Sequence, residues 1–247
     1  MARMTAFRTL WMALVGLYEE TLVLVGGNIV TLLCNLPLGL ALFLIGIPFV
    51  SNEDGSGAQW LAAVIAWLLP FLPTPGNVAL AGLTQVAAGP DVPRFEHFRQ
   101  SLRKHWSIAL RASAVSLVIL AALLWNVVFY FNIGTGWLQF VAILWLYGTA
   151  FWLSLHLYFV PLLVHVAEPR LFDLYRRAAF VSLGHFGYSF LLLLLLLIVT
   201  FASVVFLPVY VLVAGSFVSL AQAHALREIR RRHGDLVAET EEEVSRL

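Results

Sequence analysis

The sequence predicts an all-α membrane protein, a single bundle of about six transmembrane helices. Composition is the first reason: 61% of the 247 residues are hydrophobic and only 12% are charged, too few to cover a soluble protein. The second is a series of apolar runs that reach the roughly 20 residues needed to cross a bilayer. The third is the placement of the fifteen Lys and Arg residues, which lie in alternate connections between those runs.

Residues 1–20 predict an amphipathic helix at the inner membrane surface, before the first span. Phe7, Leu10 and Leu14 recur at helical spacing beside Arg8, so one side is apolar and the other basic. The apolar run that follows is longer than the roughly 7–15 residues of a signal peptide, and no small-residue cleavage site is visible. We therefore expect this segment to be retained.

The predicted transmembrane domain covers residues 21–226, with spans at about 21–50, 59–88, 106–131, 137–166, 186–206 and 208–226. The last two come from one nearly uncharged run, 188–226. As a single helix this run would be about 59 Å long, nearly twice the thickness of the hydrocarbon core. We therefore predict a tight hairpin near Pro208. Residues 227–247 change from basic to acidic and predict a solvated cytoplasmic tail.

The second span is interrupted by a cluster of helix-breaking residues. Pro70, Pro73, Pro75 and Gly76 fall within seven positions, so the helix cannot continue through them. One interpretation is a simple kink, or a turn near the outer surface. The other is a broken helix of the kind that forms substrate sites in transporters, with Gly76 and Asn77 opening a second half-helix whose free N–H groups face the first span.

Charge fixes the predicted orientation. With six crossings, every Lys and Arg falls on one side, whereas the 53–57 loop carries only Glu53 and Asp54. The excess of basic residues in cytoplasmic loops makes that side the cytoplasm, so both termini are predicted to be cytoplasmic.

Three surface segments of similar pattern precede spans one, three and five. Like residues 1–20, the segments near 94–105 and 170–178 pair apolar residues at helical spacing with bases, and they predict interfacial amphipathic helices that contact anionic headgroups. An ordinary cytoplasmic loop helix is the alternative. The unit of surface helix, outward helix and inward helix recurs at about 80–85 residues, which suggests three repeated hairpins. The predicted interfacial bases are Arg94, Arg99, Arg103, Lys104, Arg176 and Arg177.

Polar side chains at membrane depth are costly, so each is a candidate functional residue. Asn28 and Asn35 are seven positions apart and share one face of the first span. The amides could line a substrate cavity, or they could hydrogen-bond between helices and hold the bundle together. The candidate cavity residues are Asn28, Asn35, Asn77, Asn126 and His156.

Signatures of catalysis and of cofactor binding are missing from the sequence. There is no P-loop, no G-x-S-x-G and no HExxH, and Cys34 is the one cysteine. His156 and His165 are nine positions apart and face opposite sides of a helix, so they cannot form a two-ligand site on it. We therefore expect no metal, no cofactor and no enzymatic activity. The basic clusters are too short and too close to the membrane to predict nucleic-acid binding.

Several short motifs resemble the YesL-like family, also catalogued as domain of unknown function 624. Residues 28–37 resemble that family's opening N-x-x-W-x-x-x-x-L-P run, with Thr31 in place of the tryptophan. Residues 75–83 resemble its P-A-T-A-A-L stretch, and residues 158–162 its Y-x-F-P-L run. About 35 residues (39–72) separate two motifs that are nearly adjacent in typical members. The aromatic-basic segment at 95–104 and the basic stretch before the fifth span also have counterparts.

The resemblance implies a multi-pass protein of the bacterial cytoplasmic membrane. Some members are encoded near carbohydrate-uptake systems, so it also implies a link to transport. We therefore expect either a transport-associated protein, an accessory or a small carrier for carbohydrate, or a noncatalytic scaffold that binds a partner protein or anionic lipid. The expected partners are the lipid bilayer and a transporter or other membrane protein.

Overall fold

The computed structural model describes residues 5–46, 56–132, 136–166 and 170–232, and every regular element in them is helical. This confirms the predicted all-α fold. The elements in chain order are α1 (Ala6–Glu19), α2 (Thr21–Gly46), α3 (Ser56–Leu68), the 3-10 helix η2 (Leu69–Phe71), α4 (Pro75–Ala87), α5 (Phe95–Asn132), α6 (Leu138–His165), α7 (Leu171–Gly184), α8 (Phe186–Val205), α9 (Leu207–Val209), the π-helix η3 (Tyr210–Ala214) and α10 (Gly215–Arg232).

Five helical segments are long and apolar enough to cross a membrane. They are Thr21–Ala41, Leu61–Ala87, Phe95–Asn132, Leu138–His165 and Phe186–Val205, at the places of the first five predicted spans. The predicted turn near Pro208 is present, because α8 ends at Val205 and Phe206 has non-helical backbone angles. The sixth predicted span, 208–226, is divided among α9, η3 and α10, so no single regular helix covers it.

The surface segments are built in two ways. α1 and α7 are separate helices of 14 residues, each followed by a one-residue break at Glu20 (φ −114°, ψ 32°) or His185 (φ −126°, ψ 39°). The segment 94–105 does not form a separate surface helix as expected. It is the start of α5, a continuous helix of 38 residues, because no residue within it interrupts the backbone hydrogen bonds.

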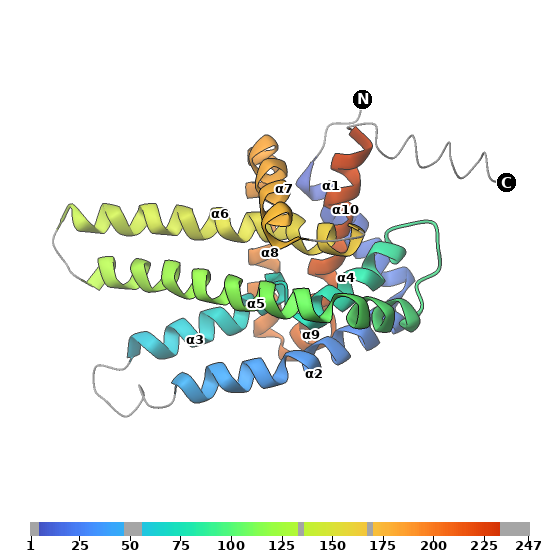
Figure 1. Ribbon diagram of the computed structural model, residues 1–247, viewed down its shortest axis with the longest axis horizontal. Coiled ribbons are helices and arrows are strands. Elements are labelled where there is room, and N and C mark those ends of the chain that lie inside the picture. The colour runs from blue at the N-terminus through green and yellow to red at the C-terminus, as the bar shows by residue number, and fades with distance from the viewer. Residues whose placement is uncertain (1–4, 47–55, 133–135, 167–169, 233–247) are drawn as a thin grey trace.

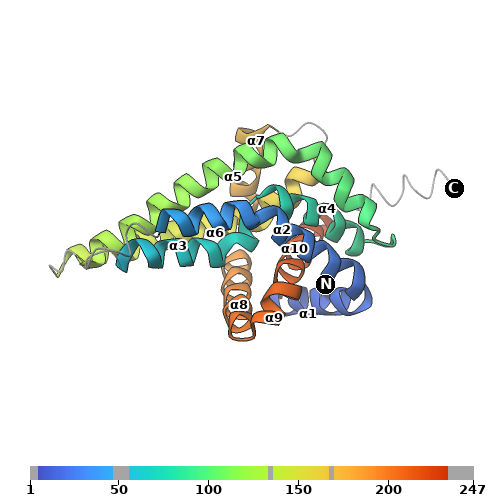
Figure 2. The same cartoon turned by 90° about the horizontal axis from the view of Figure 1, so that it is seen from below.

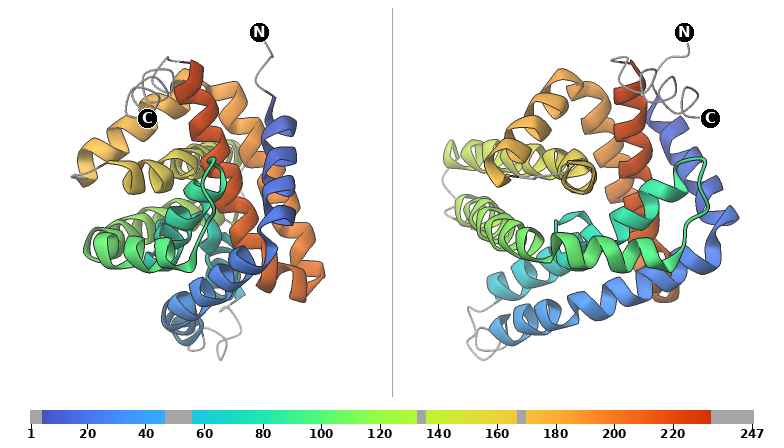
Figure 3. Two further views of the ribbon diagram at one scale, coloured as in Figure 1. Left: turned by 90° about the vertical axis from the view of Figure 1, so that its right-hand side faces the viewer. Right: turned by 45° about the vertical axis from the view of Figure 1, so that its right-hand side comes forward.

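The long helices run in two directions. α2, α3, α5 and α6 lie along the long axis of the molecule, whereas α8 runs across them in both Figure 1 and Figure 2. α1 lies beside α8 and α10, as Figure 3 shows and as their contacts establish. The two sets cannot both lie along the normal of one flat bilayer, so a common bilayer requires a large tilt in one or both.

Three helical stretches form the centre of the bundle. Every residue is buried in 76–84 of α4, 153–161 of α6 and 216–223 of α10, and the three helices pack on one another. Polar contacts join them: the hydroxyls of Thr84 and Ser219 are 2.7 Å apart, and Gln85 Nε2 donates to Pro161 O at 2.6 Å. A helix buried all round is a core element, so these stretches are solvated by protein and not by lipid.

Burial repeats three times along the chain. The start of α5 packs on α4, α7 on α6 and α1 on α10, so each surface segment covers the central helix of another unit. The buried positions share one register, with steps of 88 and 77 residues. They are Ala13, Ser101 and Ala178; Leu17, His105 and Ser182; and Leu24, Ala112 and Ser189. This periodicity supports the predicted three repeated hairpins.

Candidate functional site

The predicted break in the second span is present as an ordered polar junction. η2 ends at Phe71, and α4 begins at Pro75, whose missing N–H costs nothing at the first position of a helix. Thr74 caps α4, its side-chain oxygen accepting a hydrogen bond from the backbone N–H of Asn77 at 3.2 Å. The N–H of Asn77, which the sequence suggested would be free, is therefore occupied.

The Asn77 side chain satisfies backbone carbonyls that the helix break leaves without an intrahelical partner. Its Nδ2 donates to the carbonyl oxygens of Leu69 at 2.6 Å and Leu72 at 2.7 Å, which stand where the helix has stopped. Its Oδ1 accepts a hydrogen bond from Asn35 Nδ2 of α2 at 3.3 Å. The side chain is 6% exposed. Both N–H groups and the carbonyl oxygen of this buried amide therefore form hydrogen bonds within the protein, as is usual for buried polar groups.

α2 and α4 approach closely beside this junction. A Cβ on Gly76 would lie 2.9 Å from Thr31 O and 3.2 Å from Cys34 Cβ, so the contact requires glycine. Thr31 Oγ1 donates to Gly76 O at 3.2 Å, and Ser113 Oγ of α5 donates to Pro73 O at 2.9 Å. Pro73, Pro75 and Gly76 thus lie between α2 and α5, tied to both.

Like Asn77, Asn28 donates a hydrogen bond to a backbone carbonyl in an irregular segment. Its Nδ2 donates at 2.7 Å to the carbonyl of Val211, in the π-helix η3. Ser216 Oγ returns a hydrogen bond to Leu24 O at 2.7 Å. The structure therefore joins Asn35 to Asn77 but places Asn28 against different backbone, although both α2 amides lie on one helix face.

The other two cavity candidates lie elsewhere. Asn126 is half-buried, and its amide donates to Ala122 O of its own helix at 2.7 Å. His156 is fully buried in α6. The structure therefore does not gather the five predicted cavity residues around one space.

His156 belongs to a junction of α5, α6 and α7. Its Nε2 lies 2.8 Å from Ser116 Oγ, and its Nδ1 lies 2.8 Å from Trp152 O. Because a carbonyl can only accept, Nδ1 carries the proton, and Nε2 of the neutral ring accepts from Ser116. Ser116 Oγ in turn lies 2.8 Å from the hydroxyl of Tyr175 of α7.

A serine beside a histidine is the usual arrangement of an activated nucleophile, but this pair has no exposed surface. Ser116 and His156 are each 0% exposed, so a substrate cannot reach either. Tyr175 stacks on Phe159 with ring centroids 4.3 Å apart, and burial raises the pKa of its hydroxyl. The junction therefore fastens α7 to the bundle. Sequence reasoning missed it because the serine and the tyrosine lie 40 and 19 positions from the histidine.

The predicted interfacial bases are all exposed. They lie just before α5, on its first turns and on α7: Arg94, Arg99, Arg103, Lys104, Arg176 and Arg177. Arg176 forms an ion pair with Asp173 at 3.5 Å. At the end of α10, Arg227 donates to Ala88 O at the end of α4, and Arg230 contacts His165 at the end of α6. Bases thus cap the ends of central helices, where the helix dipole is negative.

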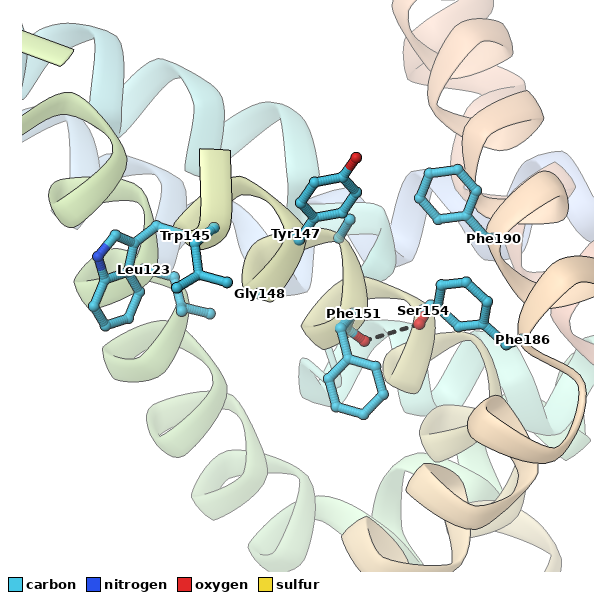
Figure 4. A pocket seen from close by; sticks show the side chains of 10 residues that line it. Leu123, Trp145, Tyr147, Gly148, Phe151, Ser154, Phe186 and Phe190 are labelled. Carbon is cyan, nitrogen blue, oxygen red and sulfur yellow. Dashed lines mark hydrogen bonds between the residues drawn. The ribbon is translucent and has the colours of Figure 1, made fainter. Parts of the chain in front are cut away.

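Two apolar cavities open between the helices. One, of about 450 Å³, lies among α5, α6 and α8, and Figure 4 shows Phe186 and Phe190 of α8 facing Tyr147 and Ser154 of α6 across it. The Ser154 hydroxyl is turned to Phe151 O at 2.9 Å. The other, of about 430 Å³, lies between α1 and the segment from α8 to α10. Such linings suit hydrocarbon, not sugars or ions.

Within the described residues no group of three or more His, Cys, Asp or Glu could hold a metal ion. Searches against known protein families, curated proteins and solved structures find no match to this chain. The resemblance to YesL-like proteins therefore stays a prediction from short motifs.

Proposed function

We propose that this chain is a noncatalytic accessory protein of the bacterial cytoplasmic membrane, which serves as a membrane-embedded scaffold for a transport system. The observation that supports this role most directly is the use of Asn35 and Asn77. A carrier for a polar solute needs free donors and acceptors along its path, whereas these amides are bonded to each other and to Leu69 O and Leu72 O. They hold the bundle together.

The lipid-facing surface supports a binding role. Large apolar side chains stay exposed at the far ends of α5 and α6, among them Phe129, Trp137, Phe140 and Leu144. Lipid solvates such a surface, and another membrane protein can replace that lipid without uncovering polar groups. The link to transport rests on the resemblance to YesL-like proteins.

The proposed orientation places both termini in the cytoplasm. It rests on the basic ends of the helices: the start of α5 and the end of α10 lie at the opposite end of the molecule from the far ends of α2, α3, α5 and α6 (Figure 1). Cysteine labelling in a Cys34→Ser background tests it. We expect Gln100→Cys to react with an impermeant maleimide only after permeabilisation and Gly136→Cys to react in intact cells. Equal labelling of both in intact cells would refute it.

A site-specific photo-crosslinker at Phe140, exposed at 72%, tests the scaffold role in the native membrane. We expect one membrane protein to crosslink in stoichiometric yield, with no crosslink from the matched buried position Leu157, which is 0% exposed. The competing function is a small carrier, favoured by the break at Pro73 and Pro75. Saturable solute uptake by the purified chain in liposomes would establish the carrier and overturn the scaffold.

A further inference from the structure

A basic cleft lies between α5 and the start of α7. It encloses about 520 Å³, and its lining from α5 includes Lys104, Ser107 and Arg111. Arg170 and Leu171 close it from the other side. The three cations come from two segments about 60 residues apart in sequence, so the fold, and not a single basic run, brings them together.

Among the residues that the structure describes, the lining of the cleft contains no acidic side chain to compensate its positive charges. Arg111 Nη2 donates to Ser107 Oγ at 2.9 Å, which holds the guanidinium along α5 and leaves its other N–H groups available. The nearby acid Asp173 is paired with Arg176 at 3.5 Å. The cleft is therefore suited to an anion with several oxygens, such as a phosphate, which Arg binds through paired N–H groups.

The same face of α5 turns apolar immediately beyond the cleft. Positions 104, 107 and 111 are followed at steps of three and four by Val115, Val118, Ala122 and Trp125. The three large side chains among these, Val115, Val118 and Trp125, are 41%, 70% and 55% exposed. From Arg111 to Trp125 the helix rises about 21 Å, more than the roughly 15 Å of one leaflet's hydrocarbon. A free phosphate would contact only the basic positions 104–111 of this helix face. A phospholipid would contact both these and the apolar positions beyond them.

We propose that the cleft formed by Lys104, Arg111 and Arg170 binds the phosphate of an anionic phospholipid in the inner leaflet, with an acyl chain along Val115 and Val118 of α5. The inference rests on the proposed function for the placement of this end of the molecule at the inner membrane surface. Its chemistry does not depend on a protein partner. The lipid would join α5 to the start of α7 across the cleft.

Binding is measured on the purified full chain in neutral detergent, by native mass spectrometry with dioleoyl phosphatidylglycerol and dioleoyl phosphatidylcholine as probes. We expect one phosphatidylglycerol to be retained at least tenfold more tightly than phosphatidylcholine. Arg111→Gln with Arg170→Gln should lower that affinity about tenfold. The matched control, Arg99→Gln with Arg103→Gln, removes the same charge from exposed positions outside the cleft and should change it less than twofold. An equal loss in both double variants would overturn the proposal in favour of diffuse surface charge.

Two further arms identify the source of the phosphate. Val118→Ser should weaken phosphatidylglycerol binding, whereas inorganic phosphate at millimolar concentration should not displace the lipid. Displacement by inorganic phosphate would overturn the lipid assignment. Monodisperse elution of each variant confirms that it folds. Since the measurement uses no partner and no oriented membrane, a failure here leaves the scaffold role standing, and saturable transport would leave the lipid site standing.

Discussion

Replacement of Asn77 by alanine tests whether the buried amides are structural. The substitution removes two hydrogen bonds to backbone carbonyls, at 2.6 and 2.7 Å, and one from Asn35 at 3.3 Å. Hydrogen bonds in membrane proteins contribute about 0.6 kcal/mol on average, which gives a lower bound near 2 kcal/mol for three. A buried polar group left without a partner costs about 1–3 kcal/mol, so the loss can reach about 5 kcal/mol. We expect the free energy of unfolding to fall by about 2–5 kcal/mol.

The matched control is Asn126→Ala, which deletes the same amide where it bonds only to Ala122 O of its own helix. It should lower the free energy of unfolding by less than about 0.5 kcal/mol, as expected for a change that leaves no buried group unpaired. The assay is unfolding of the full chain in mixed micelles with increasing dodecyl sulfate, followed by circular dichroism. If Asn77→Ala were as stable as the native chain, or if both variants lost equal stability, the structural role of Asn77 would be refuted.

Two further substitutions test the packing that holds the site. Gly76→Ala places a methyl group 2.9 Å from Thr31 O and should destabilise by about 1–3 kcal/mol, whereas Gly26→Ala, with nothing within 4 Å, should be neutral or stabilising in the same assay. Tyr175→Phe removes the hydroxyl bonded to Ser116 but keeps the ring, so we expect a loss of about 1 kcal/mol and faster amide exchange confined to α7. Burial raises the folded-state pKa of Tyr175, so its stabilisation is present below pH about 10 and is lost as pH rises through that folded-state value. The stability difference between the native chain and Tyr175→Phe should therefore narrow at high pH, and a constant difference would contradict the assignment.

The helices were predictable because hydropathy and proline placement act locally. Apolar length located the five candidate spans, and Pro73 and Pro75 located the break before α4. The separate surface helix expected at 94–105 was wrong because amphipathicity shows which face meets water but not whether a helix continues. Hydropathy also cannot tell burial in protein from solvation by lipid. Hydropathy therefore does not separate the fully buried stretch of α6 from the more exposed first half of the same helix.

The candidate site was less predictable, because its partners are distant or are backbone atoms. The sequence pointed to Asn35 and Asn77, which do form a hydrogen bond. Their backbone partners, such as Leu69 O, could not be predicted, because every residue has a carbonyl. The basic cleft has the same origin, since Arg111 of α5 and Arg170 at the start of α7 are far apart in sequence and line one cleft only in the folded chain.

The threefold repeat does not by itself explain where the amides lie. In the shared register, Asn28 corresponds to Ser116 and Leu193, and all three positions are buried. Polarity at this position is therefore not required by the repeat. Asn28 and Asn35 lie in α2, which packs against both irregular backbone segments, the broken start of α4 and the π-helix η3. Asn28 and Asn77 thus donate to backbone carbonyls where a helix is irregular or broken, which is the physical reason to regard them as structural.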